Sequence, residues 1–286
     1  MFDEILVPTD GSDCAQAAVG YAVDLARRYD ARVHALCVAD SRILENASHY
    51  ERHKKERAAI AEETCADLSA QGIEVERAVR TDVPHEAILR YARAHDVDLV
   101  VMGTHGRTGV ERFLLGSVTE KVLRLSDVPV LTVKGGAEDG TDPFTDILVP
   151  TDGSEGALAA VDPALSLAGA YDATLHALSV ADVKSLGPAV RTEPILDELL
   201  EAAEAAVEAV ETRAREANVA SAVTAVEVGY PYSEIRSYVE DHDVDLVVMG
   251  TRGRSGISRY LLGSVTEKLV RTSPVPVMTV RRPHSE

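Results

Sequence analysis

The sequence predicts an α/β protein that contains two copies of one parallel sheet, each covered by helices on both faces. Short apolar runs alternate with longer helical patterns, which is typical of parallel strands joined by crossover helices. The series then occurs a second time, since DEILVPTDGS at residues 3–12 returns as TDILVPTDGS at residues 145–154. Each copy has the length of an ordinary domain, so the repeat indicates a tandem duplication and not a solenoid.

The two copies are separated by a Gly-, Asp- and Pro-rich stretch that has no apolar period. We therefore expect a first domain at residues 1–134, a linker at 135–144 and a second domain at 145–286. The segment HALCVAD at residues 34–40 returns as HALSVAD at 176–182, so the two copies also correspond in the second strand.

In the first copy, apolar runs place the five strands near residues 3–7, 32–38, 74–79, 98–102 and 128–133. The segments between them predict helices near residues 13–29, 50–70, 84–95 and 117–125. Asp10 and Ser12 are candidate N-caps of the first helix, and Gly72 suits the end of the second. Pro84 suits the first turn of the third helix. In the second copy, the Ala- and Glu-rich residues 194–217 are expected to form the longest helix.

Composition limits the classes of protein to consider. A chain of 286 residues with 45% hydrophobic residues can form two cores. No apolar run is long enough to span a bilayer, and the N-terminus has no signal pattern, so we expect a cytoplasmic protein without a membrane partner. The net charge of −18 argues against binding nucleic acid. Because the acidic residues are spread over both copies, they favour a surface suited to high salt, as in a halophile, over a docking face for a basic partner.

Cysteine and histidine give no catalytic pattern shared by the two copies. Cys14, Cys37 and Cys65 have no CxxC spacing, and we interpret them as small buried side chains or incidental surface thiols. His49 and His53 have the spacing of a metal pair on a helix, but the second copy has no counterpart, which favours a solvated helix face.

Three further histidines differ in how they are repeated. His34 and His176 alternate with apolar neighbours on an expected strand, and we interpret both as structural. His105 lies in a glycine-rich segment, where the second copy has Arg252, so a general catalytic role is not expected for it.

A glycine motif follows the fourth apolar run of each copy. Gly103 and Gly106 are followed by the pair Gly116-Ser117, and the same spacing recurs from Gly250 onward. A strand, a glycine loop and a helix N-terminus in this order can turn backbone N–H groups toward an anion, although a lone copy would be equally typical of a tight turn. The motif lacks the Gly-Lys-Ser/Thr ending of a P-loop, and its spacing is not that of the dinucleotide fingerprint GxGxxG.

Together with Val-Pro-Thr-Asp at the end of the first strand, the spacing Gly-x2-Gly-x9-Gly-Ser resembles the universal stress protein family, and more narrowly its ATP-binding branch and its tandem-domain members. The resemblance covers nearly the whole chain twice. It implies open five-stranded sheets of order 3-2-1-4-5, of the Rossmann-like type found in adenine nucleotide alpha hydrolases. It also implies an adenine nucleotide across the carboxyl ends of strands 1 and 4, in agreement with the rule that ligands bind at the switch point of such sheets.

The resemblance implies one set of nucleotide-binding residues in each copy. In the first copy these are Pro8, Thr9, Asp10, Val38, Met102, Gly103, Gly106, Arg107, Gly116, Ser117 and Val118. In the second copy they are Pro150, Thr151, Asp152, Val180, Met249, Gly250, Gly253, Arg254, Gly263, Ser264 and Val265.

The roles implied run from the base to the phosphates. Pro-Thr-Asp would hold adenine and ribose, valine and methionine would flank the adenine, and the glycines and the last helix would meet the phosphates. Asp10 and Asp152 would contact a ribose hydroxyl or a water on Mg²⁺ or Mn²⁺, and the arginines, with Arg112 and Arg259, would offset phosphate charge. Simpler interpretations are that the aspartates only cap the first helices and that the methionines only fill the core.

The function expected is that of a module binding ATP, ADP or AMP in a stress or regulatory role. Hydrolysis requires a cation on the γ-phosphate, a metal ligand and a group that orients water, and no Ser/His/Asp set or carboxylate pair recurs in both copies. We therefore predict no catalytic residue and at most a weak ATPase. The alternatives are an ATP-cleaving enzyme of related architecture, such as a ligase, and a structural pairing protein with vacant sites.

The fifth apolar runs, at residues 128–133 and 275–280, are expected at the edges of their sheets. A proline near the start of each run fits an edge strand, and an apolar edge invites pairing. We expect the two copies to pair through these strands within the chain, as dimers of the family do. A homodimer of two chains is compatible with this arrangement.

Overall fold

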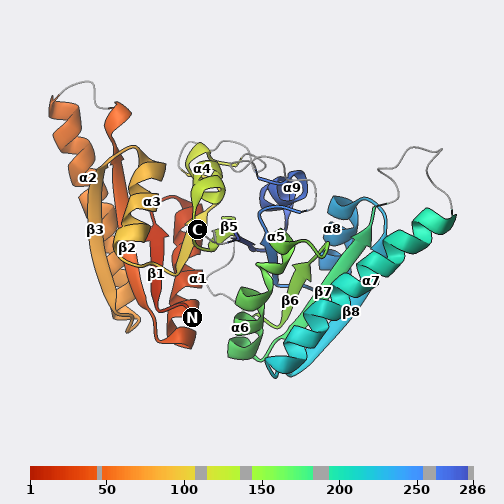
Figure 1. Ribbon diagram of the computed structural model, residues 1–286. Helices are drawn as coiled ribbons and strands as arrows, with labels where there is room; N and C mark the ends of the chain where they lie inside the picture. Colours follow the sequence, from red (N-terminus) through yellow and green to blue (C-terminus); the bar gives the residue numbers. More distant parts are fainter. Residues whose placement is uncertain (44–46, 107–114, 136–143, 183–192, 254–261, 283–286) are drawn as a thin grey trace. The chain divides into compact units, whose positions relative to one another are not determined.

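The computed structural model describes residues 1–43, 47–106, 115–135, 144–182, 193–253 and 262–282. The chain divides into two compact units, Met1–Asp142 and Pro143–Glu286. Each unit has one sheet with helices on both faces (Figure 1). Within the described residues, no helix combines the length and the apolar character required to cross a bilayer.

The first unit has the predicted doubly wound topology. Its strands are β1 (Glu4–Pro8), β2 (Arg32–Asp40), β3 (Val75–Asp82), β4 (Leu99–Gly103) and β5 (Val130–Val133). Its helices are α1 (Asp13–Tyr29), α2 (Ala47–Ala70), α3 (Pro84–Ala94) and α4 (Ser117–Leu125), with a short 3₁₀ turn at Ser41–Ile43. The strands pair in parallel in the order β3-β2-β1-β4-β5, which confirms the predicted fold class.

The second unit repeats this order as β8-β7-β6-β9-β10. Its strands are β6 (Asp146–Pro150), β7 (Thr174–Ala181), β8 (Ser221–Val228), β9 (Leu246–Gly250) and β10 (Val277–Val280). Its helices are α5 (Glu155–Leu158), α6 (Val161–Tyr171), α7 (Glu193–Glu216), α8 (Pro231–Asp241) and α9 (Ser264–Thr272). α7 is the long Ala- and Glu-rich helix that the composition predicts.

The first helix of the two units differs. α1 is continuous, whereas its counterpart is broken into the short α5 and the longer α6. Pro163 is the third residue of α6, a position in the first turn where its missing N–H would have no partner within the helix. The break therefore places Pro163 in the first turn of α6, where a helix tolerates proline.

The start of the first helix corrects one expectation. Ser12 is its N-cap, and the side-chain oxygen accepts a hydrogen bond from Ala15 N at 3.4 Å. Asp10 is not a cap: its Oδ1 accepts from Ser12 N at 3.0 Å and so holds the turn before the helix. The position of the donating amide explains the difference: Ala15 lies in the first turn of α1, whereas Ser12 precedes the helix. Pro84 opens α3, and Gly72, with φ of +80°, follows the end of α2 as expected.

The two strand histidines are buried and have the structural role expected of them. His34 Nδ1 lies 3.0 Å from Tyr91 Oη, and its Nε2 lies 2.6 Å from a carboxylate oxygen of Glu4. In the second unit, the corresponding distances from His176 to Tyr238 and Asp146 are 3.0 and 2.9 Å. Each histidine thus links the first strand to the third main helix of its unit, and burial raises the pKa of both tyrosines.

The last glycine of each fourth strand allows close packing against the first helix. A Cβ at Gly250 would lie 2.1 Å from the carbonyl oxygen of Gly156 in α5. A Cβ at Gly103 would lie 2.7 Å from the Cβ of Cys14 in α1. From the sequence, we expected these two glycines to let the backbone approach a phosphate. In the structure, the missing side chains make room for atoms of the first helix, so the two glycines also serve packing within the protein.

We predict that Gly250→Ala lowers the free energy of unfolding by about 1–3 kcal/mol, because the new methyl group meets backbone atoms that cannot rotate away. Gly169→Ala is the matched control: it lies in α6, and an added Cβ meets nothing within 4 Å. This control should raise the free energy of unfolding by about 0.5–1 kcal/mol, since alanine suits a helix better than glycine. Urea denaturation measures both. Equal stabilities for the two variants would contradict the packing described here.

Candidate functional site

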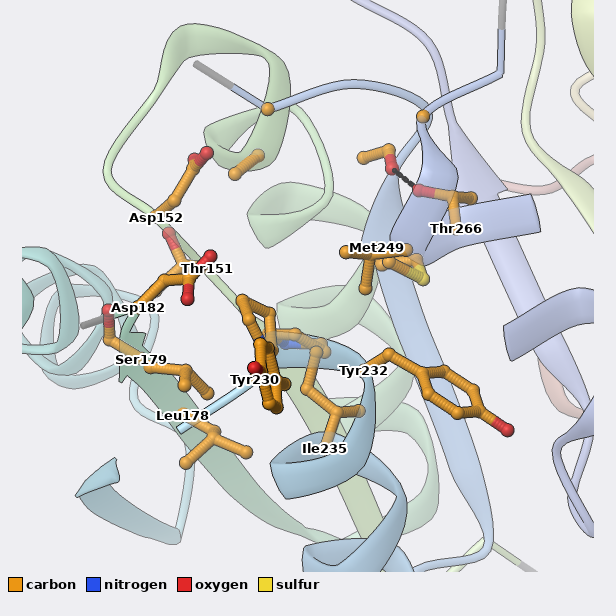
Figure 2. Close-up of a pocket in the computed structure, with 18 of the residues that line it drawn as sticks. Thr151, Asp152, Leu178, Ser179, Asp182, Tyr230, Tyr232, Ile235, Met249 and Thr266 are labelled. Atoms are coloured by element: carbon orange, nitrogen blue, oxygen red, sulfur yellow. Dashed lines mark hydrogen bonds between the residues drawn. The ribbon is translucent and has the colours of Figure 1, made fainter. Parts of the chain in front are cut away.

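The second unit contains a cavity of about 520 Å³. It lies at the carboxyl ends of β6, β7 and β9 and is bounded by the first turns of α8 and α9 (Figure 2). This is the edge of the sheet where ligands of doubly wound proteins bind, and the volume is ordinary for a small-molecule site.

Ten of the eleven positions predicted in the second copy line this cavity. They are Pro150, Thr151, Asp152, Val180, Met249, Gly250, Gly253, Gly263, Ser264 and Val265. Arg254 and its counterpart Arg107 lie outside the described residues, as do Arg112 and Arg259. The structure therefore gathers the second set, and ligand binding by these residues stays a prediction.

The loop that follows the first strand has the same conformation in both units. Thr9 Oγ1 accepts a hydrogen bond from Gly11 N at 3.2 Å, and Asp10 Oδ1 accepts from Ser12 N at 3.0 Å. The corresponding bonds in the second unit are 3.1 and 3.0 Å long. The side chains of Thr-Asp thus fix the loop through their own backbone, which holds the aspartate at the end of the strand.

The second glycine of each motif lies against this aspartate. A Cβ at Gly106 would be 2.4 Å from Asp10 Oδ2, and one at Gly253 would be 2.4 Å from Asp152 Oδ2. Only a residue without a side chain lets the glycine loop come this close to the carboxylate. The loop after the fourth strand and the loop after the first strand therefore meet at this aspartate in each unit.

The third glycine of the motif has a partner inside the loop. Gly116 N donates to the carbonyl of Thr104 at 2.8 Å, and Gly263 N donates to Thr251 O at 2.9 Å. These amides are engaged, so an anion would meet the amides of the next residues. In the second unit these are the first residues of α9, Ser264 onward, whose N–H groups have no acceptor within the helix.

Thr266 holds α9 to the fourth strand. Its Oγ1 donates to the carbonyl oxygen of Gly250 at 3.0 Å (Figure 2), and Thr119 makes the same bond to Gly103 at 2.9 Å. The bond fixes the direction of the helix N-terminus relative to the glycine loop. The amides that face the cavity are therefore held in place before any ligand arrives.

The wall of the cavity away from the glycine loop is largely apolar. Leu178 and Val180 come from β7, Met249 from β9 and Ile235 from α8 (Figure 2). Met249 is 5% exposed, as is Met102 in the first unit, so the methionines belong to the core and Met249 borders the cavity as well. Such a wall can hold an aromatic ring, because apolar contact with its faces needs no polar partner.

Sequence reasoning missed the residues that other elements bring to the cavity. Tyr230 and Tyr232 lie at the start of α8, and Leu199 and Ala203 lie on α7. The segment GYPY at residues 229–232 was an available signal: it follows the third strand of its copy, whose carboxyl end shares an edge with the glycine loop. The two α7 residues carry no motif.

Tyr232 is held at the rim by two contacts. Its Oη lies 2.9 Å from Thr272 Oγ1, and Lys268 Nζ lies 5.6 Å from the ring centroid. The hydrogen bond with Thr272 lowers the pKa of Tyr232. Lys268 thus stands beside an aromatic ring at the mouth of the site, where a cation can act on a bound anion.

His105 lies against Cys14, and its counterpart in the second unit is Arg252. The Nε2 of His105 lies 3.4 Å from the sulfur of Cys14, which also accepts from Gly135 N at 3.0 Å. Cys14 and Cys37 are buried and Cys65 is partly buried, so the interpretation as small buried side chains suits the first two.

Each site fits a metal ion that is held mainly by phosphate. Asp10 and Asp152 place one carboxylate beside each glycine loop, and Mg²⁺ is commonly held by one or two carboxylates together with substrate phosphates and water. Among the described residues, no group of three or more His, Cys, Asp or Glu side chains gathers around one point. The side chain of His49 lies outside the described part of the chain, so the structure does not address the His49–His53 pair.

Comparison with known proteins gives a consistent result. The model of the Universal stress protein family matches residues 1–134 and 143–281. A universal stress protein of Methanocaldococcus jannaschii is 36% identical over 151 residues, covering 52% of this chain and 88% of that protein. One from Mycolicibacterium smegmatis is 27% identical over 293 residues, covering 97% and 96%. The crystal structure of a universal stress protein from Archaeoglobus fulgidus superposes with a TM-score of 0.74, at 25% identity and 99% coverage of both chains.

Proposed function

The chain belongs to the universal stress protein family as a tandem-domain member, and we propose that each unit binds an adenine nucleotide, with a divalent cation, in a stress-response or regulatory role. The observation that carries the proposal is the cavity of the second unit, which has an apolar wall at one end and a glycine loop with a helix N-terminus at the other. A nucleotide has the same division into an apolar base and an anionic chain. Matching loop distances in the first unit support a second site.

Magnitudes limit the affinity that this geometry supports. Micromolar binding needs about 8 kcal/mol. A helix N-terminus contributes about 0.3–1 kcal/mol, and up to about 2 when partly buried. Burial of about 100 Å² of adenine against residues such as Val180 and Met249 adds about 2.5 kcal/mol. Loop amides, the ribose contact of the aspartate and the metal must provide the rest, so we expect moderate affinity.

The residues around the glycine loop favour a binding module over an enzyme. Arg252 and Lys268 border the cavity, but the loop has no lysine in the position that a P-loop uses. Asp152 is held by its own backbone turn, which suits a fixed contact better than proton transfer. An ATP-cleaving enzyme of related architecture remains the second candidate.

We predict that the protein binds two equivalents of ATP in the presence of Mg²⁺. Gly106→Val and Gly253→Val should each remove one equivalent, because the added side chain pushes the aspartate and the glycine loop apart. Isothermal titration calorimetry measures the stoichiometry, with circular dichroism to check folding and Gly169→Ala as a control that keeps both sites. Two equivalents in both valine variants would contradict the site assignment, and no binding to the unsubstituted protein would contradict the function.

We also predict that ATP hydrolysis is slow, below the range of about 1–10³ per second of ordinary enzymes. The physical reason is that no described group is poised both to orient water and to stabilise the leaving phosphate. Steady-state phosphate release measures the rate. A rate within the ordinary range that disappears in the double variant Asp10→Ala/Asp152→Ala would favour the enzyme alternative.

Another prediction concerns pairing of the two units through their fifth strands. Within its own unit, β5 pairs with β4 and β10 pairs with β9, and both outer strands have the apolar sequences VLTV and VMTV. Pairing of β5 with β10 would satisfy the outward N–H and C=O groups of both edges. Small-angle scattering should then show one body of fixed dimensions. A scattering profile of two independently moving bodies would rule the pairing out.

A further inference from the structure

We propose that the two nucleotide sites are not equivalent: the first recognises the charge of an extended phosphate chain through Arg57 and His53 on α2, and the second recognises the base through an aromatic and apolar wall. This inference rests on the proposed function, since it describes how each site selects among adenine nucleotides. It follows from comparing residues that the duplication makes equivalent.

The equivalence of α2 and α7 is fixed by the turn that ends them. Ile73 N donates to Leu68 O at 3.1 Å, and Val219 N donates to Ala214 O at 3.0 Å. Both bonds close the same turn between helix and third strand. Counting back along the helices from this shared turn pairs His53 with Leu199 and Arg57 with Ala203.

These positions face the site. Leu199 and Ala203 line the cavity of the second unit, and their i,i+4 spacing places them on one helix face. His53 and Arg57 have the same spacing on α2 and therefore lie on the corresponding face. We call this pair, whose charge is that of the Arg57 guanidinium group, the cationic wall of the first unit. The second unit has two apolar side chains in the same places.

A direct contact places the cationic wall at the phosphate end. Arg57 Nη1 donates to the backbone oxygen of Asp10 at 3.1 Å. Asp10 is also the residue against which Gly106 packs. The guanidinium group therefore lies next to the point where the glycine loop meets the end of β1, which is where the phosphate chain begins in the proposed binding mode.

The cationic wall has two buried nitrogen atoms that are available to a ligand. Arg57 Nε and His53 Nδ1 are shielded from solvent and have no hydrogen-bond partner among the described residues. A buried polar group without a partner costs about 1–3 kcal/mol. A phosphate oxygen would remove this cost and would form a charge-assisted bond with the guanidinium group.

Arg42, in contrast, is already paired. Its guanidinium donates to both carboxylate oxygens of Asp40, at 2.9 and 2.6 Å, and holds the pKa of Asp40 below its usual range. Among the described residues, Arg42 is therefore less available to a ligand than Arg57 of the cationic wall.

The second unit gains an aromatic ring where the first has none. Pro84 and Pro231 open equivalent helices, so Val83 corresponds to Tyr230. Tyr230 lines the cavity and is 50% exposed, with its ring near Leu178 and Ile235 (Figure 2). Base stacking on an aromatic side chain contributes about 1–3 kcal/mol and is insensitive to the number of phosphates.

In the glycine loop, the additional positive charge belongs to the second unit and not to the first. The experiment therefore exchanges the residues on α2 and α7 and leaves the loop unchanged. Arg252 borders the second cavity, whereas its counterpart His105 packs against Cys14. Each unit also has a lysine at the same place in its last helix, Lys121 in the first and Lys268 in the second. Swapping the wall residues leaves these cations unchanged, so any change in selectivity then belongs to the walls.

The test measures each site alone, in chains in which the other site is closed. Gly253→Val leaves the first site, and Gly106→Val leaves the second. Calorimetry with ATP, AMP and adenosine should give a higher ratio of ATP to AMP affinity at the first site, and a steeper loss of ATP affinity as KCl is raised. At the first site, His53→Leu/Arg57→Ala should weaken ATP about tenfold and adenosine by less than about twofold, since adenosine makes no phosphate contact.

The reciprocal variants guard against simple misfolding. Leu199→His/Ala203→Arg should raise the ratio of ATP to AMP affinity at the second site, a gain that a damaged fold does not produce. Tyr230→Val should lower the affinities of the second site for adenosine and for ATP by the same factor, about tenfold. Equal ratios at the two sites, or a first-site ratio unchanged by the wall substitution, would overturn the inference and leave nucleotide binding intact. Absence of adenine nucleotide binding at both sites would overturn the proposed function itself.

Discussion

The hydrogen-bonded pairing of the first and fourth strands is the constraint on which the candidate site depends. Ile5 aligns with Leu99 and Leu6 with Val100, and the second unit has the same register between Ile147 and Leu246. Because the strands are parallel, the loops that follow them leave the sheet at one edge. The glycine beside each aspartate then lets the two loops touch. Without this register, the aspartate turn and the glycine loop would be separate surface features.

Sequence reasoning predicted the sheet order through a family resemblance and the strand positions through apolar periodicity, because strands buried on both faces have a strong signal. It assigned the cap of the first helix in part to Asp10, since aspartate and serine have similar capping preferences and only geometry separates them. It assigned Gly103 and Gly250 to the ligand alone, because close packing of a helix on a strand leaves no pattern in one sequence. Tyr230 was missed for a related reason: two strands lie between the third strand and the strand that precedes the glycine motif.

The duplication has kept some parts of the two units the same and changed others. Bonds that hold the Thr-Asp loops agree to within about 0.1 Å between the units. The residues on α2 and α7 that face the sites differ in charge, and the first helix is continuous in one unit and broken in the other. Backbone geometry that creates a site is thus shared, while the side chains that would select a ligand have diverged. A tandem chain allows this, since neither copy needs to pair with an identical partner.

The buried histidine clusters differ in the number of protons that their hydrogen bonds require. In the second unit, two bonds join Asp146, His176 and Tyr238, and one ring proton with one hydroxyl proton satisfies both. In the first unit, the Tyr91 hydroxyl also lies 3.2 Å from Glu76, which makes a third bond. This chain of three bonds runs from the Glu4 carboxylate to the Glu76 carboxylate, and each bond requires one proton. The hydrogen bonds of the first cluster therefore require one proton more than those of the second, although both clusters consist of equivalent histidine and tyrosine residues.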